Sequence, residues 1–249
     1  MSTPPAPPRP ALLPDLDPRH WYLTAALTAT EGLWRYHRGR LLGAPVEGPC
    51  IYVAHHGAGY LSTDLALAGY ALGWREWRAG RRALQPLRFV AARSRIERAF
   101  PRAQRIKEVC GLIDPGEESC VAALEQGHQL MLTPGGHREC QPSRDFYRLR
   151  WQDRLGFVRL AVRTGAPIVP VAVAGGTAAF PGFRVGKLSF WLPFPLPARI
   201  DVAVGAPIPV ERHPGRARDP AWLRPIHERA WREAAALLQA TLAARGAAR

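Results

Sequence analysis

The sequence predicts an α/β domain in which helices cover a mostly parallel central sheet. Short apolar runs bounded by glycine or proline alternate along the chain with longer segments of helical periodicity, which is typical of repeated strand–helix units. The 249 residues can bury a sizeable core, and no linker-like stretch divides them. We therefore expect one domain over residues 19–249, preceded by a disordered or extended proline-rich arm over residues 1–18.

The first predicted element is an amphipathic helix near the N-terminus. Residues 19–42 place Trp, Tyr and Leu side chains at helical spacing among basic residues. This pattern favours a helix that packs on the core, and a helix that lies in a membrane interface is the alternative. A buried strand is then predicted over residues 51–54, an apolar run between a proline and a glycine cluster.

The later elements follow from the same two patterns. Further helices are predicted over residues 65–77, 117–126 and 156–164, and from Asp219 to the end of the chain. Strands are predicted over residues 88–92, at the start of 111–116, and over 129–133, 167–174, 188–192 and 200–204. Ser62 or Thr63 is placed to cap the helix at 65–77, and Asp219 followed by Pro220 is a typical helix start.

Two histidines and an aspartate follow the strand predicted at residues 51–54. His55 and His56 stand at its C-terminal end. A glycine-rich turn follows at residues 57–59, and Asp64 begins the next apolar segment. A carboxylate that holds one ring nitrogen of a histidine leaves the other as a general base near neutral pH, so this arrangement suits base catalysis. An equally weighted interpretation makes both histidines structural loop residues and Asp64 a helix-start charge.

The chain is strongly basic. Its formal net charge is +14 and its sequence pI is near 10.8. This balance favours an anionic partner such as nucleic acid, an anionic membrane surface or a phosphate-bearing substrate, and a solvated arginine-rich surface without specific meaning is the alternative. The four cysteines show no C-x-x-C pairing, so we expect reduced thiols and neither a zinc site nor a disulfide framework.

The apolar runs are too short to cross a membrane. None approaches the roughly 18 residues of a spanning helix, and the N-terminus lacks the charged-then-apolar order of a secretion signal. We therefore expect a cytoplasmic protein that associates peripherally with the inner face of the membrane.

Four sequence blocks stand in order between residues 49 and 176: AHHGAGYLSTD, GLIDPGEES, LTPGGHRE and LRWQDRLGFVRLAVRTGAPIVPVAVAG. The last two are the most specific, because PGG-x-RE is followed by GF-x-(K/R)-L-A and G-A-P-I-(V/I)-P-V. The series resembles the lysophospholipid (glycerolipid) acyltransferase superfamily, and within it the branch similar to diacylglycerol acyltransferases. The resemblance implies an α/β fold with a catalytic His-Asp pair at the end of a core strand.

The resemblance assigns the pair to His56 and Asp64. His56 matches the catalytic base of the family and Asp64 the residue that orients it, although seven residues separate them where four are common in the family. The implied activity is transfer of an acyl group from acyl-CoA or acyl-carrier protein to the hydroxyl of a lipid acceptor, such as a lysophospholipid or diacylglycerol, with no metal or cofactor.

Four further positions are implied to bind substrate. Backbone N–H groups at Gly57, Gly135 and Gly136 would hold the oxyanion, since glycine lets the backbone approach closely. Arg138 matches the arginine of the family motif and would bind an anionic group, with a structural ion pair as its alternative. Gly135 stands where many phosphate-binding members carry Glu, which suits a less charged acceptor.

Two other classes of function stay open. A thioesterase or other hydrolase would use the same His-Asp pair to activate water, and a basic nucleic-acid-binding protein would follow from charge alone. The sequence lacks the G-x-S-x-G elbow of serine hydrolases. It also lacks helix-turn-helix, zinc-finger and aromatic RNA-binding signatures, so no specific nucleic-acid partner is expected.

Overall fold

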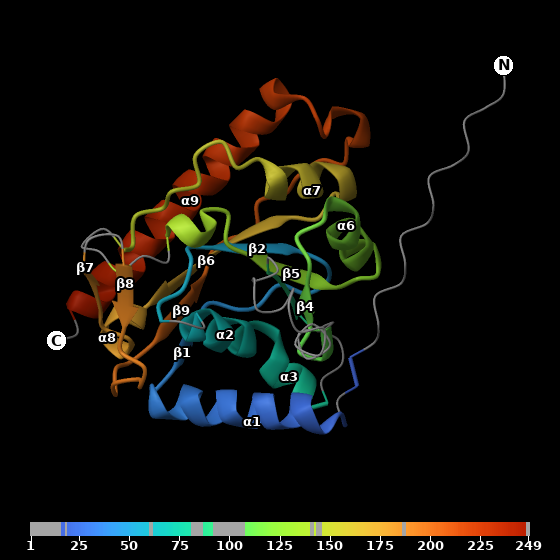
Figure 1. Cartoon of the computed structure of the whole chain (residues 1–249). Coiled ribbons are helices and arrows are strands. Elements are labelled where there is room, and N and C mark those ends of the chain that lie inside the picture. Colours follow the sequence, from blue (N-terminus) through green and yellow to red (C-terminus); the bar gives the residue numbers. More distant parts are fainter. Residues whose placement is uncertain are drawn as a thin grey trace, which may run out of the picture.

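A seven-stranded sheet forms the centre of the computed structural model, which describes residues 16–17, 19–59, 62–80, 87–91, 108–139, 142, 146–185 and 188–247 (Figure 1). The strands lie in the order β1-β9-β6-β2-β5-β3-β4. Their bounds are β1 Arg40–Leu42, β2 Ile51–Ala54, β3 Leu87–Val90, β4 Leu112–Ile113, β5 Gln129–Leu132, β6 Ile168–Ala174 and β9 Asp201–Val204. β2, β3, β4, β5 and β6 pair in parallel, whereas β9 is antiparallel to β6 and parallel to β1. The predicted α/β fold with a mostly parallel sheet is confirmed.

Both faces of the sheet are buried. Because successive side chains point to opposite faces, each strand contributes residues to both. In β2, Ile51 and Val53 belong to one apolar cluster, and Tyr52 and Ala54 belong to the cluster on the opposite face. All four are fully buried. Burial on both faces explains why the run IYVA is apolar at every position, as is typical of a central parallel strand.

Helices cover each face (Figure 1). One layer consists of α1 (Trp21–Tyr36), α2 (Thr63–Gly69), a π-helical turn η1 (Tyr70–Trp74) and α3 (Arg75–Arg78). The other consists of α6 (Glu117–Glu125), α7 (Gly156–Thr164) and the long α9 (Pro220–Gly246). Three short helices lie in connections: η2 (Gly136–Arg138), α8 (Gly176–Ala179) and η3 (Pro214–Arg216).

The first helix is shorter than predicted. We expected it over residues 19–42, but it ends at Tyr36, and Arg40–Leu42 forms β1 at the sheet edge. Arg38 adopts a positive φ of 47°, which a helix does not allow. A Cβ at Gly39 would lie 2.3 Å from the Trp34 ring, so Gly39 lets the chain pass close to that side chain as it leaves the helix. The apolar stripe of α1 is buried inside the protein, with Leu23, Leu27 and Trp34 in the core.

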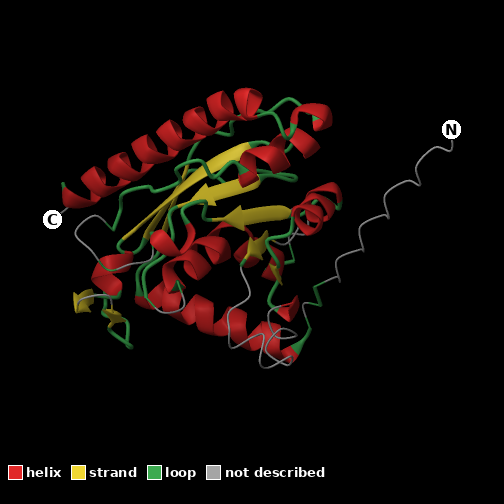
Figure 2. Cartoon of the chain, turned by 45° about the horizontal axis from the view of Figure 1, so that its top comes forward, coloured by secondary structure: helices red, strands yellow, loops and turns green. Residues whose placement is uncertain are grey.

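A small hairpin stands apart from the central sheet (Figure 2). It consists of β7 (Gly182–Val185) and β8 (Leu188–Trp191), which pair in antiparallel fashion. The strand predicted over residues 188–192 is therefore present as β8, outside the main sheet. Its partner β7 was not predicted.

Helix α9 begins as the sequence suggested. The Asp219 side chain accepts a hydrogen bond from the Ala221 N–H, and Pro220 occupies the first turn. Among the described residues, no helix combines the length and apolar character needed to cross a membrane. Most of the predicted arm at residues 1–18 lies outside the described residues.

Candidate active site

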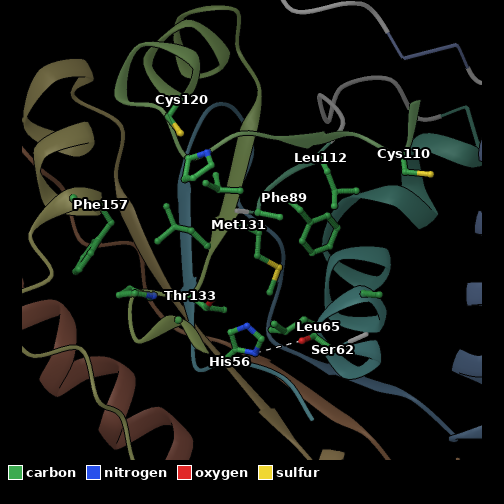
Figure 3. A pocket seen from close by; sticks show the side chains of 18 of the residues that line it. His56, Ser62, Leu65, Phe89, Cys110, Leu112, Cys120, Met131, Thr133 and Phe157 are labelled. Carbon is green, nitrogen blue, oxygen red and sulfur yellow. Dashed lines mark hydrogen bonds between the residues drawn. The ribbon is translucent and has the colours of Figure 1, made fainter. Parts of the chain in front are cut away.

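The candidate base, His56, is the second residue after β2 and lines a large cavity (Figure 3). Its Nδ1 lies 3.3 Å from the Ser62 hydroxyl oxygen and 3.4 Å from the Gly57 carbonyl oxygen. Because a carbonyl oxygen can only accept, this pair of neighbours favours the tautomer in which Nδ1 carries the proton. The lone pair then resides on Nε2, as a general base requires.

Ser62 is a member of this site that sequence reasoning took for a helix cap. It occupies the N-cap position of α2 but makes no capping hydrogen bond with its side chain. Its backbone is left-handed, with φ 47°, and its hydroxyl is directed to the His56 ring (Figure 3). The side chain expected to stabilise the helix start therefore contacts the proposed base.

Asp64 fixes the loop after His56 and does not contact the imidazole. It is fully buried, and its two oxygens accept from the Ala58 N–H at 2.9 and 3.0 Å while Oδ1 also accepts from the Leu65 N–H at 3.0 Å. Burial raises the pKa of Asp64 from 3.8 to about 6, against the effect of these hydrogen bonds. Within the described residues the predicted direct His56–Asp64 hydrogen bond is not formed. The wider spacing of this pair instead brings Ser62 next to the ring.

Two glycines allow the Asp64 carboxylate to lie against the backbone. A Cβ at Gly57 would lie 2.2 Å from Asp64 Oδ1, and one at Gly176 would lie 2.1 Å from Oδ2. Gly57, predicted to contact substrate, thus packs on Asp64 and is not among the residues that line the cavity. Gly57 therefore lets the backbone after His56 approach the Asp64 carboxylate closely.

His55 points away from the cavity into an aromatic pocket. It is 1% exposed, and its ring meets Phe146 and Tyr147 edge-on at centroid distances of 5.9 and 5.4 Å. Burial, with the neighbouring His56 as a smaller cause, lowers the pKa of His55 to about 4. His55 is therefore neutral near pH 7, and of the two histidines only His56 reaches the cavity.

Glu139 is a buried carboxylate that sequence reasoning missed. It is 2% exposed; its Oε2 accepts from the His56 N–H at 3.0 Å, and its Oε1 accepts from the Arg150 N–H. Burial raises its pKa, opposed by these two N–H donors. Glu139 thereby joins the loop after β5 to the residue that carries the proposed base. The spacing of the motif residues gave no signal for this contact, which spans 83 positions of the chain.

The two glycines of the PGG turn have different surroundings. A Cβ at Gly135 would lie 2.0 Å from Glu139 Cδ, so Gly135 makes room for that carboxylate. Gly136 has φ 55° with open space around its Cα, and it lines the cavity. Its N–H donates to the Thr133 carbonyl oxygen at 3.0 Å, so this N–H is already engaged. Arg138 is exposed, donates to Gln152 and does not line the cavity.

The cavity itself has a volume of about 1060 Å³. It is lined by residues at the ends of β3, β4 and β5 and by helices of both layers, and most of its wall is apolar. The apolar side chains include Leu23, Leu27, Leu65, Phe89, Leu112, Met131, Phe157 and Leu160. A cavity of this size and character suits a long hydrocarbon chain.

Polar and cationic groups mark part of the cavity wall. Arg154 and Arg159 line it, and the Arg159 guanidinium lies 3.6 Å from Glu117. Cys110 and Cys120 also line it as free thiols, and burial raises the pKa of both, that of Cys120 to about 11. Neither cysteine is a thiolate at neutral pH, so neither is a candidate nucleophile.

No cluster of three or more His, Cys, Asp or Glu side chains in the described part of the chain is arranged to hold a metal ion. The arrangement instead provides a half-buried imidazole with a fixed tautomer at one end of an apolar cavity. Two buried carboxylates hold the loops around it through backbone N–H groups. Such a site can remove a proton from a hydroxyl group or a water molecule.

Comparison with known proteins gives a consistent set of relatives. The family described as diacylglycerol acyltransferase matches residues 91–187, a segment that includes the PGG turn and begins after Asp64. A Gallus gallus protein named "DGAT1/2-independent enzyme synthesizing storage lipids" is 30% identical over 123 residues, which cover 45% of this chain and 37% of that protein. The Homo sapiens protein of the same name is 32% identical over 113 residues, or 41% of this chain and 35% of that protein. The match thus spans little more than a third of the length of these relatives.

One solved structure shares the fold. The 1-acyl-sn-glycerophosphate (LPA) acyltransferase PlsC from Thermotoga maritima superposes with a TM-score of 0.51 at 16% identity, covering 84% of this chain and 77% of that one. At this level of sequence identity the match shows a shared fold. It covers a larger share of the chain than the sequence matches do.

Proposed function

This chain is a relative of the glycerolipid acyltransferases, and we propose that it transfers an acyl group from a thioester donor to a lipid hydroxyl with His56 as general base. The observation that supports this most directly is the position of the His56 imidazole on the wall of an apolar cavity of about 1060 Å³. The base and the space for an acyl chain are thus adjacent. The donor is acyl-CoA or acyl-carrier protein, and no cofactor takes part.

In the proposed mechanism His56 Nε2 removes the proton of the acceptor hydroxyl as the oxygen attacks the thioester carbonyl carbon. The tetrahedral intermediate collapses, the carbon–sulfur bond breaks, and the thiolate takes the proton from His56. Ser62 and the Gly57 carbonyl hold Nδ1–H, so the ring stays oriented as it becomes cationic. Of the predicted oxyanion donors, Gly57 does not line the cavity and the Gly136 N–H is engaged by the Thr133 carbonyl, so we assign no oxyanion donor among them.

The arginines of the cavity wall suit the anionic part of the donor. Arg154 and Arg159 both line the cavity, and guanidinium groups bind phosphate oxygens in bidentate fashion. We propose that they hold a phosphate of the CoA or phosphopantetheine group. Arg138, predicted for this role, becomes a secondary candidate because its guanidinium is bound to Gln152.

The acceptor is proposed to be a weakly charged glycerolipid, such as a diacylglycerol or a lysophospholipid. Gly135 occupies the motif position at which the sequence comparison suggested loss of an acidic residue, and here its Cα packs against Glu139. The relatives are named for the synthesis of storage lipids, which supports a lipid acceptor.

The test is incubation of the purified chain with labelled palmitoyl-CoA or palmitoyl-carrier protein and a panel of lysolipids, diacylglycerol and fatty alcohols, with products identified by mass. Acyl transfer to at least one acceptor is expected. His56→Ala should lower the rate roughly 100- to 10,000-fold, the contribution typical of a general base.

The matched control is His213→Ala, a change of a partly exposed histidine that does not line the cavity, which should leave the rate unchanged. Release of free fatty acid at the same rate with and without acceptor would replace acyl transfer by thioester hydrolysis. Full transferase activity in His56→Ala would remove His56 from the mechanism.

We further propose that the protein works at the cytoplasmic face of an anionic membrane. Its net charge of +14 supports this location, as does the water-insoluble nature of the proposed acceptor. Each basic side chain near an anionic surface contributes about 1 kcal/mol, and this attraction is screened by salt.

A further inference from the structure

The largest group of exposed apolar side chains lies on the β7–β8 hairpin and the segment that follows it. We call this the hairpin surface, defined by Phe183, Val185, Phe190, Leu192, Phe194 and Leu196. These are six of the nine large hydrophobic side chains that are exposed in the described residues. Phe194 is 76% exposed and Phe183 is 62% exposed. Apolar groups gathered in this way mark an interaction site more often than scattered ones do.

The strand register of the hairpin places its apolar side chains together on the face that is exposed to solvent. Phe183 pairs with Phe190, and their rings stack at a centroid distance of 5.3 Å. Val185 lies two positions from Phe183 and therefore on the same face. Trp191, on the opposite face, is buried and packs edge-on against Phe146 at 5.7 Å. The hairpin is thus anchored by one face, and the other has no partner within the described chain.

The charge of this segment indicates the kind of partner. Residues 180–199 contain no Asp or Glu, while they include Arg184, Lys187 and Arg199. Of these, Arg184 is exposed and Arg199 is paired with Asp201. An exposed aromatic surface on a segment without acidic side chains matches a bilayer that contains anionic lipids. A second copy of this chain fits less well, because each copy carries a net charge of +14.

The hairpin surface leads directly to the loop that carries His56. Phe180, just before β7, lies against Gly59, where a Cβ would be 3.2 Å from its ring. On the other side, Trp191 contacts Phe146, and Phe146 contacts His55. The α1 end of the molecule also joins this region, since the Tyr36 hydroxyl donates to the Pro195 carbonyl at 3.0 Å. A lipid surface seated on the hairpin would therefore lie next to the proposed catalytic loop.

We propose that the hairpin surface inserts its aromatic side chains into the headgroup region of an anionic membrane. This docking places the catalytic loop at the lipid surface from which the acceptor is drawn, and in that sense it rests on the proposed function. Helix α1 is not the anchor, because its buried stripe packs on the core and its Ala26 and Thr30 line the cavity.

The experiment measures sedimentation of the full chain with phosphatidylcholine vesicles that contain or lack phosphatidylglycerol. The double substitution Phe183→Ser and Phe194→Ser should weaken binding to the anionic vesicles on the order of 100-fold, as expected for two rings that leave the interface. Phe194→Ser alone should give a smaller loss in the same direction. High salt should weaken wild-type binding further.

Two control variants separate this surface from the rest of the molecule. Trp231→Ser changes a side chain of α9 that is 40% exposed, and Trp21→Ser changes one of α1 that is 72% exposed. Both should bind vesicles as the wild type does. Equal binding by the double variant and the wild type would overturn the proposal, as would a selective loss in Trp21→Ser. If the double substitution only converts a dimer to a monomer in size-exclusion chromatography, the occupant is a second copy and the proposal fails.

Vesicle binding is read without turnover, so the two proposals fail separately. Acyl transfer to a dispersed short-chain acceptor without vesicle binding would refute the docking surface and leave the enzymatic function intact. Hairpin-dependent vesicle binding with no transfer to any acceptor would refute the enzymatic function and leave the docking surface intact.

Discussion

At the scale of single residues, the proposed base has a hydroxyl as its neighbour where a carboxylate was expected. Asp64 directs all its hydrogen bonds to backbone N–H groups, whereas Ser62 faces His56 Nδ1. A serine fixes the tautomer without adding a negative charge next to the imidazole. The ring is therefore held in a form suited to proton removal.

Removing the Ser62 hydroxyl tests this orientation. Ser62→Ala should lower kcat roughly 10- to 100-fold with little change in KM, because the ring loses a partner that fixes its tautomer. Ser62→Asn should restore part of the rate, since its side-chain carbonyl can accept from Nδ1–H and asparagine tolerates the positive φ at this position. Steady-state kinetics of both variants against Thr63→Ala, a change of the next residue, are the measurement. Unchanged kcat in Ser62→Ala would assign this hydroxyl to structure alone.

At the scale of elements, two loops from neighbouring parallel strands form the site. The loop after β2 carries His56, the loop after β5 carries the PGG turn, and Glu139 joins them. Because parallel strands end at the same edge of a sheet, residues far apart in the chain meet there. Glu139 acts as a positioning residue through the His56 backbone and does not touch the ring.

The two glycines of the PGG turn provide a matched pair. Gly135→Ala should displace the Glu139 side chain, since the added Cβ would lie 2.0 Å from its Cδ. We expect a loss of about 1–3 kcal/mol in stability and at least about a ten-fold loss of activity. Gly136→Ala adds a methyl in open space and costs only about 1 kcal/mol for its positive φ. Thermal unfolding and initial rates of both variants are compared, and a greater loss of stability and activity in Gly136→Ala would contradict the role given to Glu139.

The sequence predicted the central elements well because their patterns are local. The run IYVA is apolar at every position, and it forms the buried β2. Helix α7 coincides with its prediction, ended by Gly165 in a left-handed conformation. The end of α1 was missed because it depends on Gly39 packing under the Trp34 ring, a tertiary contact that no local pattern records.

The site was predicted only in part for the same reason. The strand pattern placed His55 and His56 at the end of β2, and the family resemblance selected His56 as the base. Ser62 was taken for a cap, since hydroxyl residues at a helix start usually have that role. Glu139 pairs with a backbone N–H 83 positions earlier, and this pairing follows from the strand order, which periodicity alone does not give.

At the scale of the whole molecule, two buried titratable groups near the catalytic loop affect folding with opposite signs. His55 has its pKa lowered from 6.5 to about 4 by burial, so the folded chain binds fewer protons than the unfolded chain between these values. Its contribution to stability falls as pH drops from 6.5 through 4. Asp64 has its pKa raised from 3.8 to about 6 by burial, so the folded chain binds more protons in that range. Its contribution therefore rises as pH drops from 6 to 4.

These opposing terms predict that the free energy of unfolding of the wild type changes little between pH 6.5 and 4 on account of this pair. At 1.36 kcal/mol per pKa unit, each group accounts for about 3 kcal/mol over its own range. His55→Phe removes the first term, so its stability relative to the wild type should increase by about 3 kcal/mol as pH falls from 6.5 to 4. Asp64→Asn removes the second, and its relative stability should decrease by about the same amount. Other buried groups such as Glu139 titrate in all three proteins and cancel in these differences. Urea unfolding at a series of pH values measures both slopes, and parallel pH profiles for the wild type and His55→Phe would show that His55 is not held neutral by its aromatic pocket.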